Sequence, residues 1–477
     1  MILSGLKPEK LYSYFEAITA IPRGSYNEAG IADYLCDFAK AHGLRFVRDK
    51  VHNVVIFKDA SAGVDALPVI LQGHTDMVCE KLPGIEHDFT RDPIELIVED
   101  GWIRANGTTL GADNGVAVAM MLAILDDETL AHPPLECVFT VCEETGLEGV
   151  LSLDPSILKG RKLINLDDGP EFFGVQSSAG SVRIDCAREA SFEKCTGSAL
   201  SVRIAGLSGG HSGAQIHEMH ANAIRIAARL LRAVLYGGGV QLAAIRGGDM
   251  VNAIPRLCTF TVAGEDVEAA LSLLETQRAQ ILEEIAVQEP EAEIEITQSD
   301  FSGEVVDIAG GQAFAALLDL APDGVLTRDV RDNFTISSSN LGIVRLEEGQ
   351  MRARFMPRAS VDSLLYDSMD RLSLLGSVLG FEVSFAEVSP GWKYEEKSEL
   401  RDILKRVSLE KFGREFTVGK IHAGLECGVF TSRIPGMDAI SIGPRTQDIH
   451  TPKERLNIES FSITYEFVRA VLEDMAK

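Results

Sequence analysis

Apolar and polar residues follow two different periods in the first third of the chain. In residues 8–21 and 27–43 the apolar positions recur every three or four residues, which predicts helices that bury one face. Gly43 is a candidate C-cap of the second helix. A further helix is predicted at 116–126, and strand-like apolar runs occur at 45–57, 68–72, 135–141 and 162–166. Strands that alternate with helices predict an α/β layer structure.

The pattern changes at about residue 178. Half-buried strands are predicted at 181–189, 199–207 and 256–264, and two long amphipathic helices at 214–235 and 266–286. His217 and His220 would then lie on the surface of the first of these helices. This α+β texture ends near Val388, the sequence SPGW at 389–392 is typical of a linker, and helical and strand patterns then resume. We predict an α/β domain, residues 1–177 and 389–477, interrupted by an α+β domain, residues 178–388.

The composition narrows the choice of function. A chain of 477 residues with 45% apolar and 24% charged residues is typical of a globular protein of two or three domains. A net charge of −26 argues against nucleic-acid binding. No secretion signal is visible, and the longest apolar stretch, 116–125, is too short to cross a membrane. Eight cysteines without a C-x-x-C pair indicate neither a disulfide framework nor a structural zinc knuckle, so we expect a reducing cytoplasm.

A histidine and an aspartate stand two residues apart after the apolar run in VILQGHTDMVCE, residues 69–80. In an extended chain, His74 and Asp76 point to the same side. A carboxylate beside a histidine fixes its tautomer and orientation, which is how many metal-binding histidines are presented. For this pair alone, an ordinary hydrogen bond at a strand end is the more common explanation.

Further acidic and histidine side chains follow other predicted strands or precede a helix: Asp113 in LGADNG, Glu143 and Glu144 in CEETG, Asp167 and Asp168 in NLDDG, and His450 in DIHTPKERL. Each alone fits a turn, a helix cap or surface charge. Together they stand where an open α/β sheet binds ligands, and two histidines with several carboxylates suit zinc or a related divalent ion. Gly107, Gly111 and Gly115 have the wrong spacing for a dinucleotide site.

The motifs HTDMV, LGADNG, CEETG, NLDDG and IHTPKE resemble the five metal-site motifs of the co-catalytic two-zinc peptidases, the family of carnosinases and carboxypeptidase G2-like enzymes. GGHSGAQIH, VNAIPR, SSSNLG, HAGLECG and SPGW resemble the aminoacyl-histidine dipeptidases within it, and the resemblance spans nearly the whole chain. It implies an aminopeptidase-like α/β catalytic domain, with a mixed sheet flanked by helices, interrupted by an α+β lid. It also implies homodimers joined through the lid, and hydrolysis of dipeptides with a free amino terminus, Xaa-His among them.

The resemblance assigns the metal ligands by position. It implies His74 and Asp167 on one zinc, Glu144 and His450 on the other, and Asp113 bridging both, with a cis peptide bond between Asp113 and Asn114. Asp167 rather than Asp168 stands in the family's position directly after the strand. Asp76 would support His74, and Glu143 would be the general base that acts on a water bound to both zinc ions. Two Zn²⁺ per chain are expected, although a carboxylate-rich site also accepts Co²⁺ or Mn²⁺.

The resemblance also implies lid residues. His211 in GGHSG would stabilise the oxyanion, in its own site or in a partner's. Asn252 and Arg358 match substrate-contacting positions, although Arg352 or Arg354 also suits the terminal carboxylate of a dipeptide. The helix that HAGLECG opens, around Gly424, offers backbone N–H groups for the same carboxylate, and Glu426 is a hypothesis for the amino end.

Two alternatives stay open. An N-acyl amino-acid deacylase of the same family would use the same metals and base but would accept a blocked amino terminus, whereas a dipeptidase should need a free amine. A metal-binding scaffold without catalysis is the alternative from another class. Degenerate relatives of that kind usually lose the base or a ligand, and here Glu143 and all five ligands are present.

Overall fold

The computed structural model describes residues 2–477, which divide into two compact units with separate hydrophobic cores. The first unit contains the chain up to Ser178, Trp392–Lys420 and Leu425–Lys477, and the second contains Ala179–Gly391 and Ile421–Gly424. The predicted fold class, an α/β structure interrupted by an α+β region, is confirmed. The return of residues 421–424 to the second unit has no counterpart in the sequence pattern.

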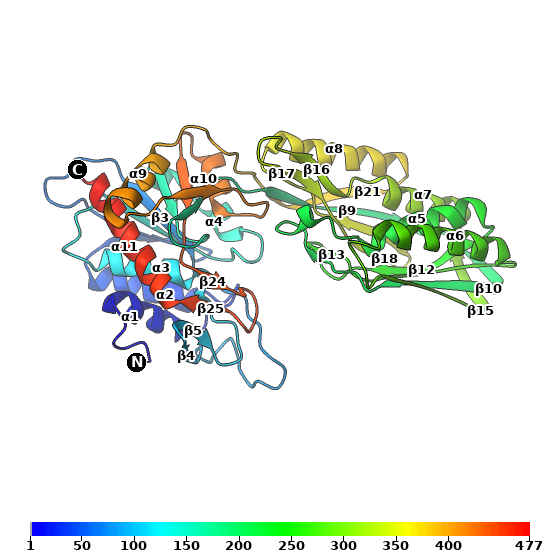
Figure 1. Cartoon of the computed structure of the whole chain (residues 1–477), viewed down its shortest axis with the longest axis horizontal. Helices are drawn as coiled ribbons and strands as arrows, with labels where there is room; N and C mark the ends of the chain where they lie inside the picture. Colours follow the sequence, from blue (N-terminus) through cyan, green and yellow to red (C-terminus); the bar gives the residue numbers. More distant parts are fainter. Residues whose placement is uncertain (1) are drawn as a thin grey trace. The chain divides into compact units, whose positions relative to one another are not determined.

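The first unit is built on a mixed sheet of eight strands (Figure 1). In spatial order these are β1 (Arg45–Arg48), β2 (Val54–Lys58), β6 (Leu135–Thr140), β3 (Val69–His74), β7 (Lys162–Asn165), β23 (Asp438–Ser441), β8 (Phe173–Val175) and β22 (Thr417–Gly419). The central strands β6, β3, β7 and β23 are parallel. Their carboxyl ends therefore meet at one edge of the sheet.

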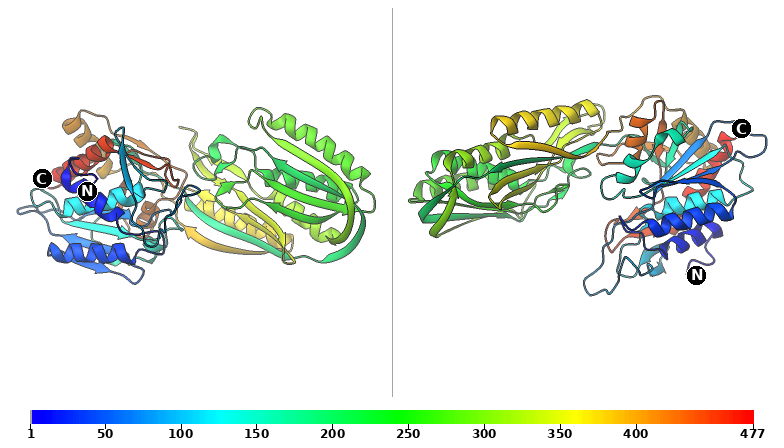
Figure 2. Two further views of the ribbon diagram at one scale, coloured as in Figure 1. Left: turned by 90° about the horizontal axis from the view of Figure 1, so that it is seen from below. Right: turned by 180° about the vertical axis from the view of Figure 1, so that it is seen from behind.

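Helices cover both faces of this sheet. The unit contains α1 (Glu9–Thr19), α2 (Ala29–Ala41), α3 (Ala112–Leu125), α4 (Glu148–Ser152), α9 (Glu399–Val407), α10 (Glu426–Arg433) and α11 (Ile458–Met475). In Figure 2, α1, α2 and α3 lie together on one face, and α4 and α10 lie on the other. Helix α3 is apolar on all sides and buried from Asn114 to Leu125, as expected for a helix enclosed between other elements.

A small antiparallel sheet completes the first unit, with β24 (Thr446–Gln447), β25 (Arg455–Asn457), β5 (Trp102–Ala105) and β4 (Leu96–Glu99) in that order. The apolar run at 45–57 forms two strands, β1 and β2, instead of one. Between them the Asp49 carboxylate accepts the backbone N–H groups of Val51 and Asn53, which closes a turn.

The second unit is an antiparallel sheet with helices α5 (Ala223–Gly237), α6 (Glu268–Ile285), α7 (Ile308–Leu320) and α8 (Asp362–Val378) along one face (Figure 1). The strand order is β15 (Glu293–Val306), β10 (Phe192–Ala205), β14 (Cys258–Gly264), β12 (Gln241–Gly247), β18 (Leu341–Glu347), β19 (Gln350–Phe355), β9 (Gly180–Glu189), β20 (Arg358–Ala359), β17 (Thr335–Ser339) and β16 (Gly324–Arg328), and β21 (Glu382–Ser389) also pairs with β9. β11 (Gly210–His211) and β13 (Ala253–Ile254) form a separate two-stranded sheet.

The predicted helix at 214–235 is wrong in its first part. Helix α5 begins only at Ala223, because the side chain of Asn222 accepts the backbone N–H groups of Ile224 and Arg225 and caps it. His217 lies in a single 3₁₀ turn, and His220 hydrogen-bonds the carbonyl of Gly209, so neither residue is on the surface of the helix.

Every helix within residues 2–477 is too short or too polar to cross a membrane.

Candidate metal centre

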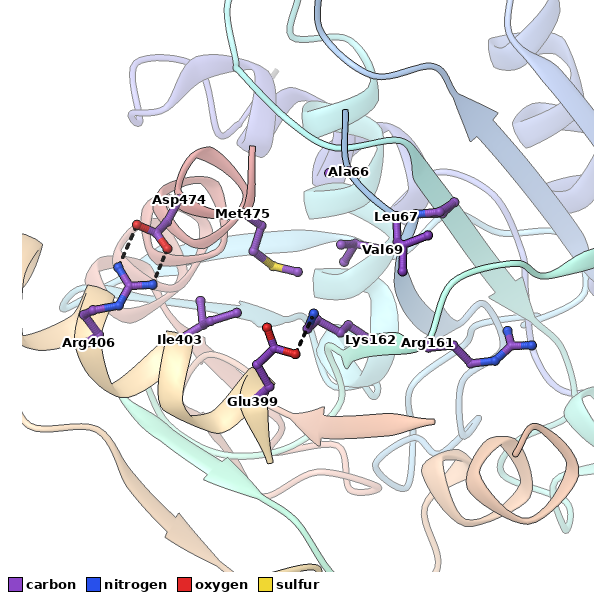
Figure 3. Close-up of a pocket in the computed structure, with 11 residues that line it drawn as sticks. Ala66, Leu67, Val69, Arg161, Lys162, Glu399, Ile403, Arg406, Asp474 and Met475 are labelled. Carbon is purple, nitrogen blue, oxygen red and sulfur yellow. Dashed lines mark hydrogen bonds and ion pairs between the residues drawn. The ribbon is translucent and has the colours of Figure 1, made fainter. Parts of the chain in front are cut away.

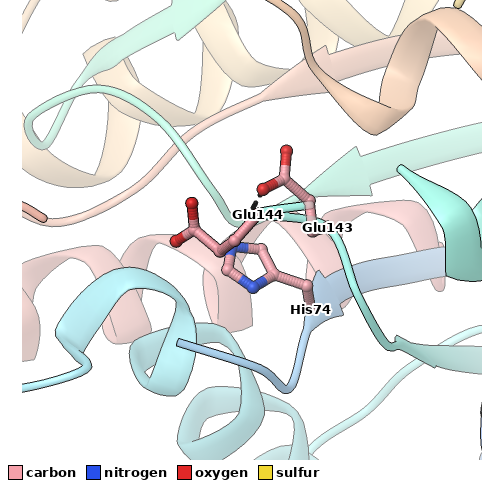
Figure 4. A group of neighbouring side chains, drawn as sticks. All are labelled: His74, Glu143 and Glu144. Carbon is pink, nitrogen blue, oxygen red and sulfur yellow. Dashed lines mark ion pairs between the residues drawn. The ribbon is translucent and has the colours of Figure 1, made fainter. Parts of the chain in front are cut away.

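Most of the predicted ligands lie at or just after the carboxyl ends of three parallel strands, at one edge of the sheet. His74 is the last residue of β3, Glu143 and Glu144 follow β6, and Asp167 follows β7. His74 is fully buried, and its Nε2 lies 3.3 Å from Asp167 Oδ1 and 4.0 Å from Glu143 Oε2. Figure 4 shows His74 beneath the two glutamates.

Asp113 joins two halves of the cluster. It lies at the start of α3, and the peptide bond to Asn114 is cis, as the resemblance implied. Its Oδ1 is 3.0 Å from His74 Nε2, and its Oδ2 is 3.1 Å from His450 Nε2. One carboxylate therefore faces two histidines from separate segments of the chain, with one oxygen for each.

His450 comes from the loop between β24 and β25, and its side chain is 46% exposed. Its Nε2 also lies 3.1 Å from Glu144 Oε2. Ligating atoms within 4.8 Å of one another occur in three groups: His74 with Glu143 and Glu144, His74 with Asp113 and Asp167, and Asp113 with Glu144 and His450. Among residues 2–477, Asp168 belongs to no such group, so the cluster contains Asp167 of the two neighbouring aspartates.

Asp76 does more than support His74. One of its oxygens lies 3.4 Å from His74 Nδ1, and the buried carboxylate also accepts the backbone N–H groups of Glu143 at 3.1 Å and Glu144 at 3.3 Å. The hydroxyl of Ser25 donates to it as well, at 2.8 Å. One aspartate thus ties the end of β3 to the loop after β6.

The cluster contains more carboxylates than histidines, and the pKa values of its members are shifted. Burial, with the negative charges of Asp167, Glu144 and Glu426, raises the pKa of Glu143 well above its ordinary value. Hydrogen bonds to Asp113 and Glu144 raise the pKa of His450 to about 11. Burial acts to raise the pKa of Asp113, but its hydrogen bonds with His450 and His74 outweigh this and lower it. Glu144 Oε1 is buried without a hydrogen-bond partner.

These residues fit a pair of divalent cations. Five carboxylates (Asp76, Asp113, Glu143, Glu144 and Asp167) surround two histidines, and oxygen and imidazole donors are the ligands that zinc, cobalt and manganese accept. Asp113 has the geometry of a bridging ligand. Cations would also offset the repulsion that raises the pKa of Glu143.

Comparison with known proteins agrees with this chemistry. The sequence model of peptidase family M20/M25/M40 matches residues 70–474. The chain belongs to peptidase family M20/M25/M40. It is therefore a hydrolase that acts on peptide bonds, and the family, whose members depend on metal, is the one that the five motifs predicted.

Two relatives of this M20/M25/M40 peptidase match over its whole length. The cytosol non-specific dipeptidase of Escherichia coli (strain K12) is 33% identical over 484 residues, which cover 99% of both chains. The crystal structure of aminoacylhistidine dipeptidase from Vibrio alginolyticus superposes with a TM-score of 0.86 at 31% identity, and covers 99% of this chain and 98% of that one. Aminopeptidase PepT from Bacillus cereus ATCC 10987, with a TM-score of 0.57 at 17% identity and 99% of this chain covered, shares the fold.

The predicted lid residues of the peptidase, His211, Asn252, Arg358 and Gly424, all belong to the second unit. His211 is on β11, and its Nδ1 accepts the backbone N–H groups of Gly213 and Ala214 at 3.3 and 3.0 Å. In the neutral ring this leaves the proton on Nε2. Asn252 directly precedes β13, and the side chain of Asn340 holds this turn by donating to the carbonyls of Val251 and Ala253, both at 2.9 Å.

The three candidate arginines differ in their surroundings. Arg352 is exposed and donates to Gln350. Arg354 forms an ion pair with Asp185. Arg358 is 6% exposed, its Nη2 donates a hydrogen bond to the sulfur of Met356, and burial lowers its pKa to about 10. Within residues 2–477 no carboxylate pairs with Arg358, and a buried guanidinium without a counter-charge is costly.

Three further buried residues shape the centre: Glu426, which the sequence offered for the amino end of a substrate, and Arg23 and Glu454, which the sequence did not single out. Glu426 is buried near the cluster: Gln72 and Thr140 donate to its Oε2, and its Oε1 has no hydrogen-bond partner. Arg23 and Glu454 are buried and hydrogen-bond the backbone of the ligand loops. Glu454 lies within DIHTPKERL, but a glutamate four residues after a ligand carries no sign of being buried.

Proposed function

We propose that the chain is a cytosolic two-zinc dipeptidase that hydrolyses dipeptides with a free amino terminus, Xaa-His among them. The observation that carries this is Asp113, whose two oxygens each face a histidine, His74 at 3.0 Å and His450 at 3.1 Å. Both full-length relatives are named as dipeptidases, one of them from the cytosol. We assign His74 and Asp167 to one ion, Glu144 and His450 to the other, and Asp113 to both.

When bound, two divalent ions that share a carboxylate lower the pKa of a water between them and polarise the carbonyl under attack. Zinc is our first choice, and cobalt or manganese also suits this donor set. Glu143 takes the proton of the attacking water and returns it to the leaving amine. Asp76 supports this step, because it holds the backbone of Glu143 and Glu144 in place.

We assign recognition of the rest of the substrate to residues of the second unit and to Glu426 of the first. His211, with its proton on Nε2, is assigned as donor to the oxyanion. Arg358, buried without a counter-charge, is assigned to the terminal carboxylate, together with Asn252 and the backbone near Gly424. For the amino end we assign Glu426, whose buried Oε1 has no partner and suits an ammonium group. We further propose a homodimer joined through the second unit.

The test uses protein stripped with a chelator and reloaded with zinc. Histidine release is measured from an Xaa-His dipeptide and from its N-acetylated form. We expect zinc-dependent cleavage of the free-amine substrate alone. Cleavage of the acetylated form alone would move the enzyme to the N-acyl amino-acid deacylases, and no cleavage of either with zinc bound would favour a binding protein.

The assignment of Arg358 to the terminal carboxylate of the substrate has its own test. Arg358→Lys keeps the positive charge but loses the planar pair of donors, so kcat/KM for a dipeptide should fall about 10- to 100-fold, the equivalent of one hydrogen bond to a charged group. Arg352→Lys is the matched control and should leave kcat/KM unchanged. A fall in kcat/KM for Arg352→Lys but not for Arg358→Lys would assign the terminal carboxylate of the substrate to Arg352.

A further inference from the structure

Two buried charges from opposite ends of the chain meet the loop that carries Asp113. Arg23 and Glu454 are each 2% exposed, and neither belongs to a group of candidate ligands. Charged side chains are rarely buried this deeply unless their partners satisfy them. In both cases the partners are backbone groups of the segments that carry the ligands.

Glu454 receives three backbone N–H groups from this loop. Its Oε2 accepts those of Leu110 at 2.8 Å and Gly111 at 2.9 Å, and its Oε1 accepts that of Asp113 itself at 3.1 Å. The residue stands four positions after His450. One carboxylate therefore connects the loop of His450 to the backbone of Asp113.

Arg23 binds the same loop from the other side. Its Nη2 donates to the carbonyl of Gly111 at 2.5 Å, and its Nη1 donates to the carbonyls of Thr75 at 2.9 Å and Asp76 at 3.3 Å. The Gly111 residue is thus held at its N–H by Glu454 and at its C=O by Arg23. Through Thr75 and Asp76, the guanidinium also connects this loop to the segment that follows His74.

The fit around Arg23 leaves room only for glycine in the loop. Gly111 has a positive φ of +69°, and a Cβ there would come within 2.6 Å of Arg23 Nη2 and 2.7 Å of Met77 Sδ. A Cβ on Gly115 would lie 2.7 Å from the same nitrogen. A Cβ cannot hydrogen-bond and would overlap these atoms, so a side chain at either glycine would have to displace the buried guanidinium.

We propose that Arg23 and Glu454 form a brace that sets the position of Asp113 relative to His74 and His450, and thereby the affinity and geometry of the two-metal centre. Both are positioning residues, because they act on the ligands through the backbone. The inference rests on the proposed metal centre. Partners of this kind, which orient ligands without binding metal, typically change metal affinity about 10- to 100-fold when they are replaced.

The test measures Co²⁺ binding to the chelator-stripped protein, by calorimetry and by the visible absorption spectrum of the bound Co²⁺. In Glu454→Gln, an amide replaces one of the two accepting oxygens, and in Arg23→Lys a single ammonium cannot span the three carbonyls. We expect each variant to bind Co²⁺ about 10- to 100-fold more weakly than the wild-type protein and with an altered spectrum. Arg23→Lys gives an independent result if Glu454→Gln does not fold.

Two matched variants separate positioning from general stability. Glu136 is a buried carboxylate at the amino end of β6 that accepts the backbone N–H groups of Lys159 and Gly160. Arg401 is a buried arginine that donates to the carbonyl of Glu395. Glu136→Gln and Arg401→Lys should lower the melting temperature of the apo protein about as much as the brace variants do. They should leave Co²⁺ affinity and spectrum unchanged.

The brace proposal would be overturned if Glu454→Gln and Arg23→Lys both folded and bound Co²⁺ with the affinity and the spectrum of the wild-type protein. The same conclusion follows if all four variants weaken Co²⁺ binding equally, because the effect would then be one of stability alone. A wild-type protein that binds no Co²⁺ would instead refute the metal centre itself, and with it both proposals.

Discussion

The two ends of the eight-stranded sheet differ in the balance of their charged side chains. At the amino ends of β3 and β7 lies a cavity of about 350 Å³, where Lys162 pairs with Glu399 at 3.1 Å and Arg406 with Asp474 at 2.6 Å (Figure 3). At the carboxyl ends of the same strands, five carboxylates gather around two histidines, and the nearby Arg23 donates to backbone carbonyls instead of to these carboxylates. Positive and negative charges are matched at one end, and negative charge is in excess at the other.

The comparison shows how a chemical site differs from an ordinary charged surface. Paired charges at the amino end need no further ion, and pairs of this kind, with one exposed partner each, add little stability. The carboxyl end contains buried carboxylates with raised pKa values, which are unfavourable unless cations join them.

The largest effect is expected at Glu143. Glu143→Gln removes the proton acceptor but none of the five proposed ligands, so kcat should fall about 10²- to 10⁴-fold while metal content stays the same. Metal content by mass spectrometry and kcat on a dipeptide are measured together. Asp168→Asn serves as the control, because its carboxylate lies beside the cluster without joining a ligand group, and its kcat should change little. Loss of metal from Glu143→Gln would make Glu143 a ligand.

Removal of the metal should have the second-largest effect. Each bound ion stabilises the native state by about 2.7 kcal/mol when free metal is at 100 times its dissociation constant. Thermal unfolding of the chelator-stripped protein should therefore begin at a lower temperature, and added zinc should reverse the change. Asp113→Asn weakens the bridge and should reduce this dependence on zinc. If added zinc left the melting temperature of the stripped protein unchanged, the excess of carboxylates at the carboxyl end of the sheet would not be a metal site.

The smallest effect is expected at the amino end. The hydrogen bond from Arg406 is the main cause that lowers the pKa of Asp474 from 3.8 to about 2. Because this pKa is lowered in the folded state, the stabilisation is present above about pH 4 and is lost as the pH falls towards 2. Arg406→Gln should cost less than about 1 kcal/mol at pH 7, and urea titrations should show the difference shrinking as the pH falls below 4 and vanishing only below about pH 2. Its kcat at pH 7 should be that of the wild-type protein.

The metal cluster was predictable because its residues stand at strand ends, where a parallel sheet must bring them together. Asp113 and His450 are 337 residues apart in sequence, yet each carries a local sign, a glycine-rich turn or a polar motif after a strand. Arg23 and Glu454 carry no such sign. Whether a charged side chain is buried depends on which backbone groups surround it, and that is decided only by the tertiary fold.

The errors in the fold have local causes of the same kind. Residues 214–235 have apolar residues at helical spacing throughout, but Asn222 provides a cap within the run, and α5 begins there. In residues 45–57, Asp49 accepts backbone N–H groups and bends the chain between two strands. In both stretches one short polar side chain, bonded to its own backbone, outweighs the apolar pattern.

The most direct test of the account is a crystal structure of the zinc-loaded protein with anomalous data at the zinc edge. We predict two peaks, one contacted by His74 and Asp167, the other by Glu144 and His450, with Asp113 reaching both. A single peak, or peaks that Asp113 does not join, would contradict the two-metal centre on which the proposed chemistry depends.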